Sequence, residues 1–325
     1  MRPFDYVRPA SMDEAISLLG DDGQSRLLAG GTDLLTLMKH EITTPERLID
    51  IKRLPQLDGR IEPSGDGLRI GALATLTQIE DDPFITGTYA ALSQAAGLAA
   101  TPQLRNMATI GGNLLQRPRC WYYRSEHVNC WLKGGNDCPA RDGENQQHAL
   151  FGESPCVAVH PSDLATALLA LGASVELTGS GGSRTVTLDE FFVLPEDGRR
   201  TENVLGESEI VTAIALPAAP STMRSTYLKA MDRKVWAFAL VGAGVRLVVE
   251  NGVIADARLA LGGVAPIPWR AQRAESVLIG SQPGSELFDR AAQLAVEGAI
   301  PLAHNGYKVP LLKSLVRNAL QSAIS

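Results

Sequence analysis

The sequence predicts an α+β protein built from two or three structural units. Before the segment Pro217–Pro220, short apolar runs typical of strands alternate with segments of helical periodicity. After this segment, Asn251–Gly252 separates two apolar runs, which is typical of a β-hairpin with a type I′ turn. Three helical segments follow the hairpin. The chain of 325 residues is long enough for such an arrangement.

Each unit is predicted from its own patterns. The first unit, residues 1–55, begins a helix at the capping box Ser11 to Glu14 and then alternates strands at 26–29 and 48–51 with a helix at 34–39. The second unit, residues 56–220, begins with turns at 58–67 and should contain strands at 68–72, 174–178 and 210–216 and helices at 89–100 and 163–171. The third unit, residues 221–325, should contain the hairpin strands 245–250 and 253–261 and helices at about 269–278, 285–297 and 309–323.

Charge and hydropathy exclude several classes of function. The net charge is −6 and no basic stripe is present, so nucleic acid is not an expected partner. No apolar run approaches the ~18 residues of a membrane span. The first residues contain neither a long apolar segment nor a small-residue cleavage site, so no signal peptide is expected and the cytoplasm is the default compartment.

The segment LLAGGTDLL, residues 27–35, places two glycines directly after an apolar strand. Gly30 and Gly31 would let backbone N–H groups approach a charged ligand, and the following helix would present its positive end. The alternative is an ordinary turn in which Thr32 or Asp33 caps the helix. From this motif alone, the ordinary turn is the favoured interpretation.

A second glycine turn, LRNMATIGGNL at residues 104–114, makes a ligand site more plausible. Thr109 and Asn113, beside Gly112, could donate hydrogen bonds to phosphate oxygens, although a simple glycine-permitted bend is the alternative. Two such turns favour a pyrophosphate, because this group needs converging donors. Neither turn has the G-x-G-x-x-G pattern, so a Rossmann nucleotide site is disfavoured.

A third motif, HPSDLATALLAL at residues 160–171, places an acid at the start of an apolar helix. Asp163 could accept a hydrogen bond from an amide or hydroxyl of a ligand. Equally, Ser162 or Asp163 could simply cap the helix.

The four cysteines of the chain lie within 37 residues and are Cys120, Cys130, Cys138 and Cys156. Four thiolates suit zinc or a [4Fe–4S] cluster, but neither the C-x2-C pairs of structural zinc nor the ferredoxin pattern is present. Two disulfides and four unrelated buried thiols are the other interpretations, and a chain of this size has no need of disulfides. The segment would bury little apolar surface by itself, so a metal centre of undecided identity is favoured.

Taken together and in chain order, four motifs give a specific resemblance. AGGTDLL, QLRNMATIGGNL, HPSDLATALLAL and YLKAMDRKVWAFALVGAGV resemble the FAD-binding middle subunit of the molybdenum hydroxylases, which include xanthine dehydrogenase, carbon monoxide dehydrogenase and aldehyde oxidoreductases. The resemblance covers essentially the whole chain. It implies a vanillyl-alcohol-oxidase-like (PCMH-type) FAD-binding domain of two α/β subdomains and a C-terminal α/β domain of the CO dehydrogenase flavoprotein type.

The resemblance also implies which residues bind FAD, with no catalytic residue on this chain. The first turn would wrap the pyrophosphate and approach the flavin with Leu27, Leu28, Ala29, Gly30, Gly31, Thr32, Asp33 and Leu34. Thr109, Gly112 and Asn113 would complete the phosphate site, Asp163 would touch FAD, and Lys229 would lie near the isoalloxazine ring.

The cysteines lie in a segment that most of these subunits lack. Asn113 and Asp163 are 50 positions apart here, whereas their motifs are close together in most relatives. One branch of the family has an insert at this place that holds a [4Fe–4S] cluster. It includes the β subunit of 4-hydroxybenzoyl-CoA reductase and the FAD subunit of periplasmic-type aldehyde oxidoreductases, to which the flanks of the insert 117–157 are more similar. The resemblance therefore implies an iron–sulfur cluster rather than zinc.

The implied function is electron transfer within a heterotrimer or its dimer. A large subunit would hold the molybdenum cofactor and a small subunit two [2Fe–2S] clusters, from which electrons would reach FAD here and then an external acceptor. A xanthine dehydrogenase-like or 4-hydroxybenzoyl-CoA reductase-like complex is the alternative. Export on the signal of a partner would place the complex in the periplasm. The substrate, the acceptor and the role of the [4Fe–4S] cluster are left open.

Two other classes of function are weaker. A stand-alone FAD oxidase would need a complete substrate-binding domain, for which the 105 residues after Pro220 (325 minus 220) are few. A non-enzymatic zinc-binding scaffold would carry no flavin.

Overall fold

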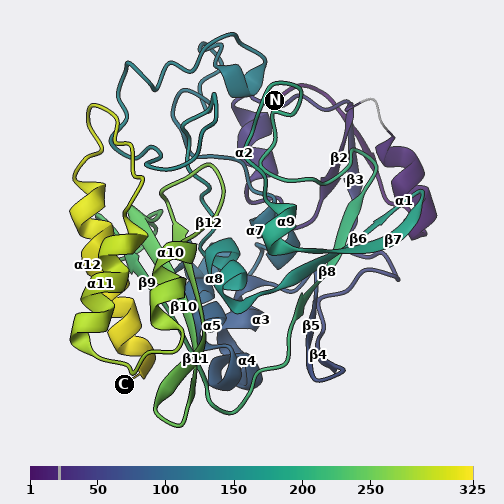
Figure 1. The fold of residues 1–325 in the computed structure, drawn as a ribbon. Coiled ribbons are helices and arrows are strands. Elements are labelled where there is room, and N and C mark those ends of the chain that lie inside the picture. Colours follow the sequence, from purple (N-terminus) through teal and green to yellow (C-terminus); the bar gives the residue numbers. More distant parts are fainter. Residues whose placement is uncertain (21–22, 325) are drawn as a thin grey trace.

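The computed structural model describes residues 1–20 and 23–324 and has the α+β fold that the sequence predicts (Figure 1). Among these residues, three separate sheets follow one another along the chain. None of the described helices combines the length and the apolar character needed to cross a bilayer.

The first sheet is parallel and has the order β1-β3-β2. Its elements are β1 (Asp5–Val7), α1 (Met12–Leu19), β2 (Ser25–Leu28), α2 (Leu34–Lys39) and β3 (Arg47–Asp50). Helix α1 begins as predicted, because the Ser11 side chain accepts a hydrogen bond from the backbone N–H of Glu14. The Glu14 carboxylate accepts from the N–H of Ala10, which completes the start of the helix.

The second sheet has the order β4-β5-β8-β6-β7. Its strands are β4 (Ile61–Ser64), β5 (Gly67–Gly71), β6 (Ser174–Gly179), β7 (Gly182–Thr187) and β8 (Ile210–Leu216). The accompanying helices are α3 (Leu76–Asp81), α4 (Pro83–Thr88), α5 (Ala90–Leu98), α6 (Pro102–Arg105), α7 (Ile110–Leu114), α8 (Asp163–Leu171) and α9 (Leu188–Phe191). The prediction of turns alone at 58–67 is wrong, because β4 lies there. This strand is at the sheet edge, where Pro63 needs no backbone N–H.

The third sheet has the order β12-β11-β10-β9. Its elements are β9 (Met223–Ala230), β10 (Val241–Glu250), β11 (Val253–Gly262), β12 (Trp269–Arg270), α10 (Gln272–Leu278), α11 (Ser285–Ala295) and α12 (Lys308–Ile324). The predicted hairpin turn is confirmed, since Asn251 and Gly252 have φ of 51° and 77°, as a type I′ turn requires. Trp269 and Arg270 form a short strand and do not begin the predicted helix.

Helix α8 is buried along its whole length and lies between the two large sheets (Figure 1). It packs against β10 and β11 through glycines: a Cβ at Gly262 would lie 2.7 Å from Thr166 Oγ1, and one at Gly244 would lie 3.1 Å from the Thr166 carbonyl oxygen. Because side chains alternate along a strand, Ala243 and Val245 point the other way, into the core that contains α12. The sheet is therefore covered on both faces.

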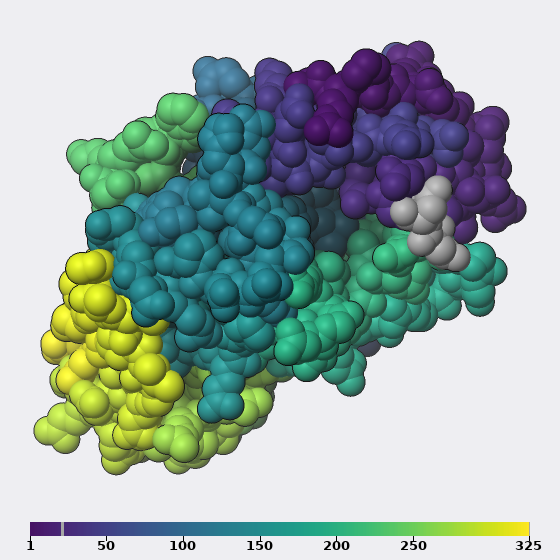
Figure 2. Space-filling model, turned by 90° about the horizontal axis from the view of Figure 1, so that it is seen from above, coloured from purple at the N-terminus to yellow at the C-terminus, as the bar shows by residue number. Residues whose placement is uncertain are grey.

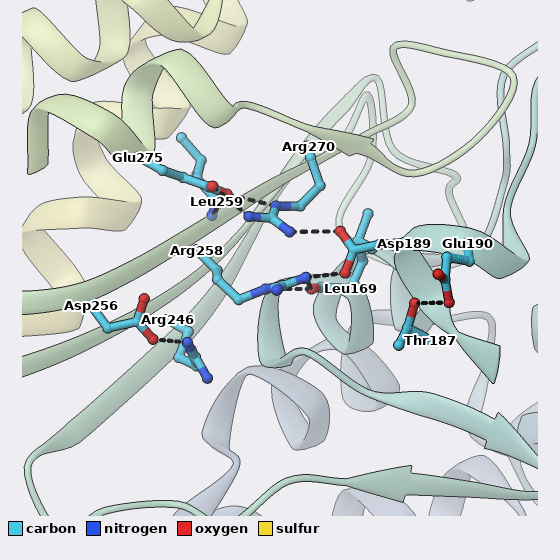
Figure 3. Close-up of polar contacts among 10 residues, drawn as sticks. All are labelled: Leu169, Thr187, Asp189, Glu190, Arg246, Asp256, Arg258, Leu259, Arg270 and Glu275. Atoms are coloured by element: carbon cyan, nitrogen blue, oxygen red, sulfur yellow. Dashed lines mark hydrogen bonds and ion pairs between the residues drawn. The ribbon is translucent and has the colours of Figure 1, made fainter. Parts of the chain in front are cut away.

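A carboxylate joins the second unit to the third on one side of α8. Asp189 of α9 accepts hydrogen bonds from Arg258 of β11 at 2.5 Å and from Arg270 of β12 at 2.6 Å (Figure 3). Arg258 also donates to the Leu169 carbonyl at the end of α8, and Arg270 pairs with Glu275. These contacts fix how α8 and α9 sit on the C-terminal sheet.

The cysteine-containing insert, residues 117–157, is irregular. Among the described residues of this insert, the regular secondary structure is the 3₁₀ helix η1 (Trp131–Lys133). Figure 2 shows the segment, in teal, between the purple N-terminal unit and the yellow C-terminal helix. Its last part packs against the C-terminal helices, since Leu150 and Phe151 are buried in the hydrophobic core around α12.

Candidate functional site

The two glycine turns meet backbone to backbone. A Cβ at Gly30 would lie 1.9 Å from the Met107 carbonyl oxygen and 3.3 Å from the Ala108 Cα. No other residue type fits at this position without moving one of the turns. The structure thus brings the segment 27–34 directly against the segment that contains Thr109 and Gly112.

The second turn is joined to the start of α8. Thr109 caps the short helix α7, with its hydroxyl accepting from the Gly112 N–H at 3.3 Å. Ser162 donates its hydroxyl hydrogen to Asn113 Oδ1 at 2.5 Å and accepts from the Ala165 N–H at 2.9 Å. Ser162, rather than Asp163, is therefore the N-cap of α8, and the predicted cap is confirmed for that residue.

Asp163 belongs to a buried polar group with two side chains of β9. Tyr227 donates to Asp163 Oδ1 at 2.5 Å, and Lys229 Nζ lies 2.8 Å from Asp163 Oδ2. Burial raises the pKa of Asp163, against the opposing charge of Lys229, and burial also raises the pKa of Tyr227. Lys229 additionally donates to the Leu98 carbonyl at 3.1 Å. The two predicted FAD contacts, Asp163 and Lys229, are thus a direct ion pair.

Asp33 is the N-cap residue of α2, as one interpretation of the first turn predicts, but its side chain makes no capping hydrogen bond. Its carboxylate is used by the start of the insert. It accepts from the Arg117 N–H at 2.9 Å, and the guanidinium groups of Arg119 and Arg124 each approach it at 2.8 Å. Burial lowers the pKa of Arg119 to about 10, which leaves it charged at neutral pH. The first turn therefore holds the insert by charge.

A small cavity lies between the insert, the start of α8 and the β9–β10 loop. Its volume is about 30 Å³, which is room for about two water molecules. It is lined by the insert at Arg119 and His148, by the start of α8 at Asp163, and by the β9–β10 loop at Phe238. The Arg119 guanidinium lies 4.8 Å from the centre of the Phe238 ring, as in a cation–π contact.

All four cysteines lie in the described part of the chain, and none of them forms a disulfide bond there. The thiol of Cys156 hydrogen-bonds to the sulfur of Cys138 and so lowers the pKa of Cys138. Burial, and to a smaller extent the charges of Cys138 and Cys130, raises the pKa of Cys120 to about 11. Among the described residues, no group of three or more His, Cys, Asp or Glu side chains is arranged to hold one metal ion.

Two family models together match nearly all of the chain. Residues 2–219 match the FAD binding domain in molybdopterin dehydrogenase, and residues 226–323 match the CO dehydrogenase flavoprotein C-terminal domain. The chain belongs to the FAD-binding medium subunits of the molybdenum hydroxylase family. It is therefore an oxidoreductase subunit, as the sequence motifs predict.

Individual relatives of this flavoprotein subunit extend over its full length. It is 38% identical to the aldehyde oxidoreductase FAD-binding subunit PaoB of Escherichia coli K12, over 99% of both chains. It is 31% identical to the carbon monoxide dehydrogenase medium chain of Hydrogenophaga pseudoflava, over 98% of this chain and 96% of the relative. The solved carbon monoxide dehydrogenase from the same organism superimposes with a TM-score of 0.79 at 30% identity, covering 99% of this chain and 98% of that one.

The residues brought together suit the FAD of this family. Gly30 lets the two turns meet backbone to backbone, and the Gly112 N–H is bound to the Thr109 hydroxyl on the second turn. Thr109, Asn113 and Asp163 add polar atoms on the adjoining segments.

The insert of this flavoprotein subunit fits an iron–sulfur cluster in the kind and number of its donors. A [4Fe–4S] cluster is larger than one zinc ion, so its four thiolates stand farther apart than the ligands of a single ion. Cys130 and Cys156 are buried in one hydrophobic cluster, against which Cys120 packs, and Cys138 packs against the cluster that contains Val157. Among the described residues the four cysteines do not form a single-ion site. The residues that would hold the cluster are Cys120, Cys130, Cys138 and Cys156.

Several residues of the site were not predicted from the sequence. Tyr227 carried a usable signal, since it lies two positions before Lys229 and therefore on the same face of a strand. Arg119 and Arg124 lie in a run of interleaved basic and aromatic residues, a pattern that does not indicate Asp33 as their partner. His148 had no local signal, because what it contacts is set by the fold.

Proposed function

We propose that this chain is the FAD- and [4Fe–4S]-carrying electron-transfer subunit of a molybdenum-dependent aldehyde oxidoreductase. Its partners would be a large molybdenum-cofactor subunit and a small subunit with two [2Fe–2S] clusters. The observation that carries the proposal is that the cysteine insert is attached, through Asp33, to the turn expected to bind FAD. Identity of 38% to PaoB, against 31% to a carbon monoxide dehydrogenase medium chain, favours an aldehyde as the substrate of the complex.

In this proposal the chain positions FAD and contributes no catalytic residue. Bound FAD supplies a group that accepts electrons in pairs or singly. The backbone of residues 27–34, with Thr109, Gly112 and Asn113, would bind the pyrophosphate. Asp163 would touch FAD, and Lys229 would lie near the isoalloxazine ring. The charge of Lys229 opposes the rise in the pKa of Asp163 that burial causes.

Each cysteine would bind one iron of the cluster as a thiolate. The cluster would either relay electrons toward an external acceptor or order the insert.

We also propose three units, 1–55, 56–220 and 221–325, with the insert 117–157 inside the second. Two large hydrophobic cores support the boundary near Pro220, since one consists mainly of residues before it and the other mainly of residues after it. A few residues of the third unit, such as Tyr227, belong to the first core. The complex would be cytoplasmic unless a partner subunit carries an export signal.

The test is metal and flavin analysis of the complex purified without oxygen. We expect one FAD and about four irons per chain beyond those of the [2Fe–2S] pair, with an additional electron paramagnetic resonance signal after reduction. Stoichiometric zinc without surplus iron would leave the flavoprotein assignment and overturn the cluster. Absence of flavin from the intact complex would overturn the proposed FAD site.

The two roles of the cluster are separated by Cys130→Ser. If the cluster is a relay, substrate still reduces FAD at the wild-type rate, but the external acceptor is no longer reduced. If the cluster only orders the insert, the variant loses protection of residues 117–157 from hydrogen exchange and keeps turnover. Comparing aldehydes with xanthine as the reductant of FAD in the wild-type complex decides the substrate class.

A further inference from the structure

We propose that His148 is a positioning residue for the iron–sulfur centre: its imidazole donates a hydrogen bond to the sulfur of Cys120 and so favours the reduced cluster. This inference rests on the proposed function, because it assumes that Cys120 binds a [4Fe–4S] cluster. It goes beyond that proposal by assigning a role to a residue that is not one of the four thiolates.

The geometry of the pair carries the argument. His148 Nε2 lies 3.2 Å from Cys120 Sγ, within hydrogen-bonding distance for sulfur. The His148 side chain is almost completely buried, and the edge of the Trp121 ring packs against it with ring centres 5.0 Å apart. The imidazole is therefore largely out of water, whereas the Cys120 side chain is part-buried and lines the small cavity beside it.

Chemistry fixes which group is the donor. A thiolate bound to iron carries no proton, so the hydrogen between Cys120 and His148 must be on Nε2 of the imidazole. The other ring nitrogen, Nδ1, is buried and has no hydrogen-bond partner among the residues the structure describes. Within the described chain the hydrogen-bonding side-chain partner of the ring is the Cys120 sulfur, and the backbone of Asn145 lies close enough to act to raise the pKa of His148.

The main chain of His148 is held from the third unit, which fixes where the ring points. Asn305 donates its amide hydrogens to the carbonyls of His148 and Ala149 at 3.1 and 3.0 Å. Lys308, fully buried at the start of α12, donates to the His148 carbonyl at 3.0 Å and also to that of Gly263. These contacts cross between the insert and the C-terminal core, so the ring position does not depend on the cluster alone.

The expected effect is on the reduction potential of the cluster. Reduction adds negative charge to the cluster and its sulfurs, so a hydrogen-bond donor stabilises the reduced form more than the oxidised form. Removing the donor should therefore lower the midpoint potential. A purely structural role for the histidine would not give this shift.

The experiment compares variants in the intact, anaerobically purified complex. His148→Phe removes the donor, whereas His148→Gln keeps an N–H near the position of Nε2. The matched control is His127→Gln, because His127 lies in the same insert with its side chain 86% exposed. We expect His148→Phe to lower the midpoint potential of the [4Fe–4S] signal, and His148→Gln and His127→Gln to stay near wild type. If wild type and His148→Phe both contain the cluster and have the same midpoint potential, the inference is wrong.

A second measurement needs no variant that might lose the cluster. Pulsed electron paramagnetic resonance of the wild-type complex, grown with ¹⁵N-histidine, should show a nitrogen coupled to the reduced [4Fe–4S] cluster. A loaded cluster without that coupling overturns the inference and leaves the proposed function standing. Iron analysis that finds no [4Fe–4S] cluster in the wild type overturns the proposed function, and this inference with it.

Discussion

Lys229 Nζ lies 2.8 Å from Asp163 Oδ2, and the two side chains are 1% and 5% exposed. The pair connects strand β9 of the third unit to the first residue of α8 in the second. Because both charges are out of water, each is tolerated only in the presence of the other. Asp163, but not Lys229, also lines the small cavity between the insert, the start of α8 and the β9–β10 loop.

Removing one member of this pair should destabilise the protein strongly. We expect Lys229→Met to lower the free energy of unfolding by ~3–5 kcal/mol, because it leaves the Asp163 carboxylate buried and unpaired. The double variant Lys229→Met with Asp163→Asn should cost less than the sum of the two single changes. Urea unfolding measures this, with Lys313→Met on an exposed contact as the control. A cost below ~1 kcal/mol for Lys229→Met would contradict the buried-pair argument.

Gly30→Ala should separate the two glycine turns. The added Cβ would lie 1.9 Å from the Met107 carbonyl oxygen, so one of the turns has to move. We expect FAD affinity, measured from flavin fluorescence during titration, to fall at least ~tenfold, which is ~1.4 kcal/mol. Gly87→Ala is the matched control, since a Cβ there meets nothing within 4 Å. Unchanged affinity in Gly30→Ala would mean that these turns do not bind FAD together.

Asp33→Ala should loosen the insert. The change removes the acceptor shared by the Arg117 N–H and the guanidinium groups of Arg119 and Arg124. We expect faster amide hydrogen exchange in residues 117–133 and wild-type exchange in the third unit. Asp13→Ala, in the first turn of α1, is the control for loss of an acidic residue. If the insert exchanges at the wild-type rate, Asp33 does not hold it.

Asp189 should make the junction of the second and third units sensitive to acid. Burial acts to raise the pKa of Asp189, but hydrogen bonds and charges of Arg258 and Arg270 outweigh it and hold the pKa below its ordinary value. The ionised Asp189 therefore contributes fully to the free energy of unfolding above the unfolded-state pKa of ~3.9. This contribution disappears as the pH falls through the lower pKa of the folded state.

The measurement is the difference in free energy of unfolding between wild type and Asp189→Asn. We expect this difference to shrink as the pH falls from ~5 toward ~3. Asp289→Asn is the control, because Asp289 and Arg317 form a half-exposed pair that should contribute little at any pH. If the difference is constant with pH, the charge of Asp189 does not contribute to the free energy of unfolding.

Local sequence patterns predict elements well where they reflect burial. Helix α8 and strand β8 have the predicted bounds, because runs of apolar residues in them are buried on nearly all sides. Strand β7 was missed for the opposite reason: its side chains are mostly exposed and it pairs only with β6, so no apolar alternation marks it. Strand β4 was hidden by its proline and by the glycine turn that follows it.

For the candidate site, the sequence identifies segments better than contacts. The motifs at 27–35, 104–114 and 160–171 do come together, but the part played by Asp33 is set by residues 84 and 91 positions away. In the same way, Tyr227 is 64 positions from Asp163. No local pattern carries such distant pairing, because it results from how the sheets and the insert pack.

The hydrogen bonds from Asn305 and Lys308 to the main chain of His148 have a consequence for the order of biosynthesis. Asn305, which holds the main chain of His148, is 157 positions further along the chain. At a translation rate of about 5–20 residues per second, roughly 10–30 s separate the two on the ribosome. During this time the thiols have emerged but the C-terminal residues that hold their loop do not yet exist. Delivery of iron is therefore expected after release of the finished chain, when the loop first has a fixed shape.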